Sequence, residues 1–560
     1  MSRLKSFDKW IGTGSPWVWL SAGMVSLNLI MVFGLLALIA ARGLGHFWPA
    51  EVISFELRDS AGASQTLLGT IADEEQVTAQ RVRDTGIEVP ADVELVTRYL
   101  IKVGNRDISG ADFVWINDLD IVAQSKPRSV VVIERQEWGN FYGFLSSVEK
   151  LQRNDTTDDT WKALSESLQS KLVLDKEIEK HEIGAINYAM ERLRLEERAL
   201  ELDGIEAGAP YEKIATKRQA LQKDYDALNA KLVEKYVEIN RDNAVVKTVT
   251  GEQAKISMAD IVRVYRPNDM SRLEKIGHYF SKVWEFIADD PREANTEGGV
   301  YPAIFGTVLL VLSMSVFVTP FGVVAAIYLR EYAHQGLLTR VIRIAVNNLA
   351  GVPSVVYGVF GLGFFVYFLG GNIDSLLFPE ALPSPTFGTP GLLWSSLTLA
   401  ILTVPVVIVS TEEGLTRIPR AIREGSLALG ATKAETLWRT VLPMATPAMM
   451  TGLILSVARA AGEVAPLMMV GVVKLAPSLP LDGNLPYLHL DRKFMHLGFH
   501  IYDVGFQSPN VEAARPLVYA TALLLIILIV TLNIAAIRMH KVVIHMFVLI
   551  DMIDDGWIGE

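Results

Sequence analysis

Long uncharged apolar segments constrain this chain more than any other feature of its sequence. Each is long enough to cross the roughly 30 Å hydrocarbon core of a bilayer as a helix. Over the whole chain 50% of residues are hydrophobic and only 21% are charged, which is unusual for a soluble protein. The sequence therefore predicts an all-α polytopic membrane protein with six transmembrane helices, placed near residues 17–41, 301–329, 345–370, 393–411, 447–472 and 516–538.

The length of the first segment predicts a transmembrane helix that stays in the mature protein and is not cleaved off as a signal peptide. Residues 17–41 hold no charge over 25 residues, whereas the apolar core of a cleaved signal peptide has only about 7–15. Cleavage remains the alternative interpretation. Arg3, Lys5 and Lys9 lie in the polar segment 1–16 and favour a cytoplasmic N-terminus by the positive-inside rule. We therefore expect the segment after this helix to be exported.

That segment, residues 42–300, has the composition of a soluble acidic domain. It carries 34 Lys and Arg against 46 Asp and Glu, a net charge of −12, while the rest of the chain carries 18 against 17, a net of +1. No basic face is concentrated anywhere, which argues against nucleic-acid binding. Short alternating or β-branched stretches predict strands near residues 51–57, 93–103, 130–134, 244–249 and 255–264. We expect a periplasmic α+β domain.

A helical hairpin is predicted within this domain at about residues 162–240. Apolar residues recur at a spacing of three to four on both sides of the turn-like segment 203–210. Two such helices joined by a Gly/Pro turn form an antiparallel coiled-coil hairpin, whose apolar stripe is the seam between the helices. Docking of a partner on the hairpin tip is the alternative role.

The charges of the loops predict the orientation of the membrane helices. Loops 330–344 and 412–446 are rich in basic residues, and the tail 541–560 begins with Lys541. Loop 371–392 has no Lys or Arg, and loop 473–515 has a mixed count. By the positive-inside rule both termini are cytoplasmic and residues 42–300 are periplasmic.

Loop 412–446 has a pattern of its own. Residues 419–429 favour a helix that begins with proline, and Gly430 suits the left-handed residue that closes a helix. Thr432 is a good cap for a second short helix reaching Leu442, after which Pro443 introduces the next span. The loop is therefore expected to form a compact helix–Gly–helix unit outside the membrane.

The spacing of this loop resembles the E-A-A-x(3)-G-x(9)-I-x-L-P signature of ABC importer permeases. Glu424, Gly430, Leu442 and Pro443 occupy the corresponding positions, although Gly425 and Ser426 replace the two alanines and Thr440 replaces isoleucine. In that family the loop is the coupling helix that docks into the ATP-hydrolysing subunit. A plain amphipathic loop at the membrane interface is the alternative.

Three further stretches are similar to the PstA family of phosphate permeases: residues 306–332, residues 351–362 with the sequence P-S-V-V-Y-G, and residues 458–466 with A-R-A-A-G-E-V-A-P. The resemblance implies a type I ABC importer (MetI-like) permease core over 301–540, in a long form of PstA that carries an inserted periplasmic domain. The function implied is that of a permease subunit for ATP-driven import of inorganic phosphate across the bacterial inner membrane. No P-loop motif occurs in this chain.

The resemblance also implies partners. These are a PstC-like permease, a dimer of a PstB-like ATPase that would bind ATP and Mg, and a PstS-like phosphate-binding protein. No cofactor is expected in this chain, and no residue is predicted to be catalytic. Two other functions remain open: a membrane-anchored sensor, although four more spans follow the second, and a permease for another oxyanion such as sulfate or molybdate.

Residues within the predicted spans have functional interpretations of their own. Gly351 and Pro353 interrupt an apolar helix, which is tolerated where the helix lines a cavity or meets a neighbour. Gly358 and Gly361 allow close helix–helix approach. We interpret these residues as helix-packing or hinge positions.

Arg459 and Glu463 form the most informative pair. They lie four residues apart on one helix face, in a predicted span without other charges. Charge at such depth is expensive and faces the bundle interior or a water-filled path. A guanidinium suits a tetrahedral oxyanion, so the pair is a candidate for the substrate pathway. A purely structural ion pair is the alternative.

His496 and His500 also have helical spacing, with Asp491 and Asp503 nearby. This spacing would allow a metal site, but no third strong ligand is fixed. A surface loop is the preferred interpretation, and no metal is expected.

Overall fold

A computed structural model describes residue 13 and residues 15–58, 64–84, 89–90, 92–148, 183–205, 208–240, 243–292, 295–508 and 511–554. The predicted N-terminal segment 1–16 lies mostly outside these residues. So do the start of the predicted hairpin, 162–182, and the end of the tail, 555–560.

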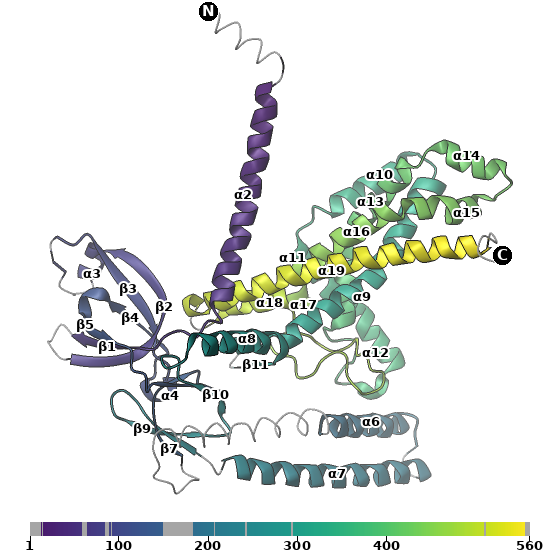
Figure 1. Cartoon of the computed structure of the whole chain (residues 1–560). Coiled ribbons are helices and arrows are strands. Elements are labelled where there is room, and N and C mark those ends of the chain that lie inside the picture. The colour runs from purple at the N-terminus through teal and green to yellow at the C-terminus, as the bar shows by residue number, and fades with distance from the viewer. Residues whose placement is uncertain are drawn as a thin grey trace, which may run out of the picture.

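The chain forms a helical core and an inserted domain beside one end of it (Figure 1). The core is built mainly from α9, α13 and α16, which bury Leu310, Met314 and Leu399 completely. Helix α2 (Ser15–Gly45) reaches the core through α19, where Gly43 lies against the backbone of Tyr519. The other core helices are α9 (Tyr301–Ile327), α10 (Leu337–Leu349), α11 (Ser354–Phe360), α12 (Gly371–Leu377), α13 (Leu392–Arg417), α14 (Arg420–Ala428), α15 (Lys433–Glu435), α16 (Leu442–Gly462), α17 (Leu467–Val470), α18 (Leu497–Tyr502) and α19 (Val511–Asp554).

Six helices in the described part of the chain are long and apolar enough to span a membrane, which confirms the predicted number. These candidate spans are Trp17–Gly45, Tyr301–Tyr332, Ser354–Leu377, Leu392–Arg417, Lys433–Gly462 and Ala514–Arg538. The helices at both 17–41 and 393–411 extend beyond their predicted ends, because hydropathy marks the apolar stretch and not the polar turns that continue the helix.

The prediction for the third span, 345–370, was wrong at its start. Residues 345–349 belong to α10, and the span begins only at Ser354. Pro353 has extended geometry, with ψ 135°, at the start of α11. A residue that precedes proline avoids the helical region, so the chain breaks at Val352 and Pro353.

The prediction for the fifth span, 447–472, was also wrong, as was the separate short helix ending at Leu442. The helix that begins at Lys433 continues to Gly462 without a break. A π-helical segment, Thr436–Val441, precedes Pro443. A wide π turn is one of the ways in which a helix accommodates a local disturbance, and proline lacks the N–H group of a regular turn.

The inserted domain consists of two antiparallel five-stranded sheets, ordered β4-β3-β2-β1-β5 and β10-β6-β7-β8-β9. Apolar residues such as Phe55, Ile101, Ile133 and Phe141 are completely or almost completely buried in it. The strands are β1 (Ile53–Arg58), β2 (Ser64–Thr78), β3 (Leu95–Lys102), β4 (Phe113–Asn117), β5 (Ile121–Ser125), β6 (Val131–Arg135), β7 (Phe141–Val148), β8 (Asn243–Lys247), β9 (Gln253–Ser257) and β10 (Ile261–Tyr265), with short helices α3 (Ala79–Arg83) and α4 (Arg106–Ser109).

Helices α6 (Ile183–Leu202) and α7 (Ala209–Asn240) lie side by side as a hairpin (Figure 1). The hairpin is inserted between β7 and β8, which pair with each other at Val148 and Ala244. It extends along the core, where the Tyr188 hydroxyl donates to the Leu485 carbonyl at 2.6 Å. The hairpin therefore contacts the loop between α17 and α18, which is far in the sequence from the strands that flank the hairpin.

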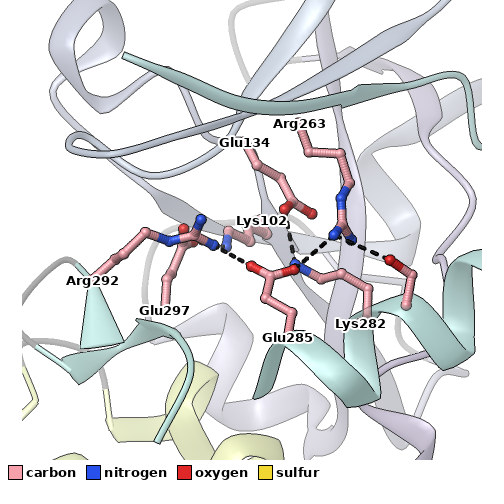
Figure 2. A network of polar contacts seen from close by, with 8 residues as sticks. Lys102, Glu134, Arg263, Lys282, Glu285, Arg292 and Glu297 are labelled. Carbon is pink, nitrogen blue, oxygen red and sulfur yellow. Dashed lines mark hydrogen bonds and ion pairs between the residues drawn. The ribbon is translucent and has the colours of Figure 1, made fainter. Parts of the chain in front are cut away.

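A buried charge network joins the inserted domain to the core (Figure 2). Glu285 of α8 (Arg272–Ala288) is only 6% exposed, and its carboxylate lies 3.0 Å from Arg263, 3.1 Å from Lys282 and 2.7 Å from Arg292. Lys282 also contacts Glu134 of β6 at 2.8 Å. The partners come from β6, β10, α8 and the small β11–β12 ribbon (Pro291–Arg292 with Glu297–Gly298), just before α9.

The network favours the charged form of the Glu134 carboxylate. Burial by itself would raise the pKa of Glu134, but the positive charges of Lys282 and then Arg263 outweigh it and lower that pKa. Lys102 of β3 pairs with Glu297 at 3.2 Å, which extends the contacts to the first sheet. Both sheets are thereby held to the segment that enters the membrane.

Candidate coupling and translocation sites

Loop 412–446, the predicted coupling loop, leaves the core as a helix–Gly–helix unit at the end of the molecule opposite the hairpin (Figure 1). Helix α14 begins after Pro419, and Gly430 then adopts φ +93°, a left-handed value that glycine reaches without strain. Thr432 and Glu435 form a reciprocal capping box at the start of α15. The local geometry of the loop is thus determined by a proline, a glycine and a threonine cap.

One face of this unit packs on the core and the other is exposed. Leu442 is buried, and it packs with Leu415, Ile418 and Leu437. In contrast, Leu429 is 91% exposed and Trp438 is 72% exposed. Glu424, Gly430 and Pro443 are exposed as well. The predicted coupling residues therefore divide into one that anchors the unit, Leu442, and three at its surface.

Two side chains that the sequence interpretation missed hold the loop in place. Arg423 of α14 lies 3.0 Å from Glu331, which is in the π-helical turn Tyr328–Tyr332 that continues the end of α9. Arg423 also donates to the carbonyl of Leu415 at 2.7 Å. Lys433 donates to the Glu331 carbonyl at 2.5 Å and lies 4.6 Å from the centre of the Tyr332 ring. The sequence signal that could have indicated these contacts was a loop rich in basic residues together with an acidic residue at the end of a predicted span.

The predicted helix-packing glycines lie against distant parts of the chain. A Cβ atom built on Gly358 would lie 2.7 Å from the Cα of Pro466, and one built on Gly361 would lie 2.9 Å from Val470. The two segments quoted for their sequence motifs, around residues 358 and 466, therefore pack backbone to backbone. Gly351 and Pro353 lie at the break between α10 and α11.

Arg459 and Glu463 meet as an ion pair. The Arg459 Nε lies 3.5 Å from the Glu463 carboxylate, and their side chains are 33% and 19% exposed. Arg459 lies in the last turn of α16, whereas Glu463 follows the end of the helix with ψ 136°. The pair is thus located at a helix end, with the Arg459 side chain about one third exposed.

The interpretation of His496 and His500 as surface residues was wrong. Both are buried, at 0% and 3% exposure, because α18 packs under α19. Burial lowers the pKa of each imidazole to about 4, so both rings are neutral at pH 7. No group of three or more possible metal ligands occurs among the described residues.

Comparison with known proteins shows the family to which this chain belongs. Residues 318–545 match the model for the binding-protein-dependent transport system inner membrane component. The phosphate transport system permease protein PstA 1 of Mycobacterium tuberculosis is 36% identical over 243 residues, covering 43% of this chain and 69% of that protein. The chain belongs to the PstA family of phosphate transport permeases. The PstA core is therefore a MetI-like permease domain, as predicted.

Other relatives include a phosphate transport system permease protein named PstC. PstC of Xylella fastidiosa is 31% identical over 224 residues, covering 38% of this PstA-family chain and 66% of that protein. Among solved structures, the inward-facing MetNI methionine ABC transporter matches with a TM-score of 0.32 and 19% identity, covering 49% of this chain and 99% of that one.

Proposed function

We propose that the chain is the permease subunit of an ATP-driven importer of inorganic phosphate. The observation that carries this proposal is the exposed helix–Gly–helix unit on a PstA-family core, since its Leu429 and Trp438 present apolar surface for a soluble partner. A PstC-like permease would complete the translocation path. A PstB-like ATPase dimer would bind the coupling loops, and a PstS-like protein would deliver phosphate.

Uptake of radiolabelled phosphate and sulfate tests the substrate, in a strain whose only such transporter contains this chain. We expect ATP-dependent phosphate uptake that excess unlabelled sulfate does not reduce. Glu424→Lys reverses a surface charge on α14 and should reduce both uptake and co-purification of the ATPase. Uptake of sulfate in place of phosphate would instead support the alternative oxyanion permease.

The proposal places both termini and the coupling loop in the cytoplasm, and residues 42–300 in the periplasm of the bacterial inner membrane. Because the chain has no cysteine, single cysteines report on orientation. Ala220→Cys in α7 and Ala428→Cys in α14 form a matched pair of exposed positions. An impermeant maleimide should label the first in cells with a permeabilised outer membrane, and the second only after lysis. The reverse pattern would overturn the topology.

Within the pathway, we propose that Arg459 contacts phosphate during translocation and that Glu463 orients it. A single Arg459→Ala change also leaves Glu463 without its partner, which confounds the two roles. The double change Arg459→Ala with Glu463→Ala removes both charges. We expect this variant to remain inactive although it is inserted and bound to the ATPase. Recovery of uptake by the double variant would leave the pair with a structural role only.

A further inference from the structure

The cytoplasmic end of α9 is tied to the coupling loop by one guanidinium. The Arg423 Nη2 lies 3.0 Å from the Glu331 carboxylate and donates to the Leu415 carbonyl at 2.7 Å, while Nη1 donates to the Ile418 carbonyl at 3.0 Å. Leu415 is in the last turn of α13, and Ile418 follows it. Arg423 therefore connects α9, α13 and α14 through a single side chain.

This contact is shielded from solvent. The side chains of Arg423 and Glu331 are only 19% and 14% exposed. A shielded ion pair is screened less by salt and water than a surface pair, so it resists separation more strongly. The planar fork of arginine reaches several acceptors at once, which the single ammonium group of lysine does not reproduce.

A second contact reaches the same point from the other side of Gly430. Lys433 donates to the Glu331 carbonyl and lies over the ring of Tyr332. The end of α9 thus touches both helices of the loop, although about ninety to a hundred residues separate these partners in the sequence. Displacement of the coupling loop must either carry α9 with it or break both contacts.

The opposite end of α9 lies beside the charge network of the inserted domain. Arg292 and Glu297 of that network precede Tyr301, the first residue of α9, by only a few residues. The Val300 amide donates a hydrogen bond of 2.8 Å to the carbonyl of Phe286 in α8. Helix α9 is therefore held at both ends, by the coupling loop and by the inserted domain.

We propose that Glu331 is a positioning residue that transmits movement of the coupling loop to α9 through Arg423. This inference rests on the proposed function and deepens it, because it states how force from an ATPase enters the core. Glu331 does not shape the outer face of the loop, which α14 and Trp438 present. Loss of its charge should therefore uncouple ATP hydrolysis from transport without releasing the ATPase.

The test is the ratio of phosphate transported to ATP hydrolysed, measured on the complete transporter in proteoliposomes. Glu331→Gln should lower this ratio by about five-fold or more, the range of a typical coupling free energy. Glu413→Gln is the matched control, because Glu413 is an exposed glutamate near the end of α13. The control should keep the ratio of the unaltered chain.

Two further variants separate transmission from general stability. Arg423→Lys keeps the charge but loses the fork, so it should give an intermediate ratio. The double variant Glu331→Gln with Arg423→Gln should be no worse than the more affected single variant, since residues that act through each other are non-additive. Additive losses would overturn the proposal.

The remaining outcomes of this experiment also test the inference. An unchanged ratio in Glu331→Gln, with normal uptake by the unaltered chain, would overturn this inference alone. Loss of the ATPase from Glu331→Gln would overturn it too, because the residue would then shape the docking surface. Absence of ATP-dependent phosphate uptake by the unaltered chain would overturn the proposed function and this inference together.

Discussion

The core is joined to its two appendages by different devices. At the inserted domain, Glu285 contacts three basic side chains, and further pairs extend to both sheets. At the coupling loop, one guanidinium, that of Arg423, binds a single carboxylate and two backbone carbonyls. The first junction is a network of several ion pairs, whereas the second combines one ion pair and the lysine beside it with apolar packing around Leu442.

This difference teaches how rigidity and movement are distributed. In this network Glu285 has three partners, so the loss of one contact leaves the others in place and the two bodies stay fixed. At the coupling loop, loss of the Arg423–Glu331 contact removes the ion pair between the loop and the end of α9, so we expect the loop to move more readily there. We therefore interpret the inserted domain as a fixed extension of α9 and the coupling loop as the movable part.

The largest effect is expected at the network. Glu285→Gln leaves Arg263, Lys282 and Arg292 without their common carboxylate, in a site that is almost fully buried. Removing one partner of a buried ion pair costs about 3–5 kcal/mol. We expect the free energy of unfolding of the inserted domain to fall by about 3 kcal/mol, measured by proteolysis in increasing urea.

The control for this variant is Glu51→Gln. Glu51 pairs with Lys126 at 2.5 Å and with Lys275 of α8 at 3.5 Å, and the Glu51 side chain is about half exposed. Surface pairs contribute at most about 1 kcal/mol. Equal effects of the two changes would contradict the interpretation of the network as a rigid junction.

A smaller effect is expected from backbone strain in the coupling loop. Gly430 has φ +93°, and no atom lies within 4 Å of a Cβ built there, so a larger residue meets strain but no clash. Gly430→Val should cost roughly 1–3 kcal/mol or force the loop to change shape. We expect phosphate uptake to fall about ten-fold or more, as 1.4 kcal/mol corresponds to ten-fold.

Gly425→Val is the matched control for the loop. It lies within α14, is also exposed, and has no neighbour within 4 Å of a built Cβ. It should be tolerated much better, because its backbone is helical. Similar losses in both variants would indicate that bulk on the loop surface, and not the left-handed turn, is responsible.

The smallest effect is expected at the contact of the hairpin with the core. Tyr188→Phe removes the hydroxyl that donates to Leu485 but keeps the ring, which lies 5.7 Å from that of His489. One hydrogen bond is worth about 1 kcal/mol. Hydrogen exchange at the Asp482 amide of this loop should accelerate by no more than about five-fold, with phosphate uptake unchanged. A strong loss of uptake would show that the hairpin takes part in transport.

Membrane spans were the most predictable part of the fold, because a long apolar run permits few alternatives to a helix. The ends of the spans were less predictable, as Lys433 and Pro353 show. The polar residues from Lys433 onwards continue the helix of the fifth span, and the third span starts only after Pro353. Several strands of the inserted domain were also missed. In β2 the acidic residues Asp73, Glu74 and Glu75 disguise a strand that pairs with β3.

The residues of the candidate site also divide into those that the sequence predicted and those that it did not. The helix–Gly–helix geometry around Gly430 could be predicted because it depends on local backbone preferences. The contact of Arg423 with Glu331 could not, since it joins residues 92 positions apart. His496 and His500 have helical spacing in the sequence, but only the packing of α18 against α19 shows that they are buried.

By itself the sequence determined the membrane class, the number of candidate spans, the acidic insertion and the turn of the coupling loop at Gly430. These depend on hydropathy, net charge and backbone preference, which act over a few residues or as sums over a segment. The tertiary structure alone decided which charges meet. Glu285 gains its partners from β10 and the β11–β12 ribbon, and Glu331 gains Arg423 from α14. Such pairs form because buried charges need partners, and the fold determines which distant segments supply them.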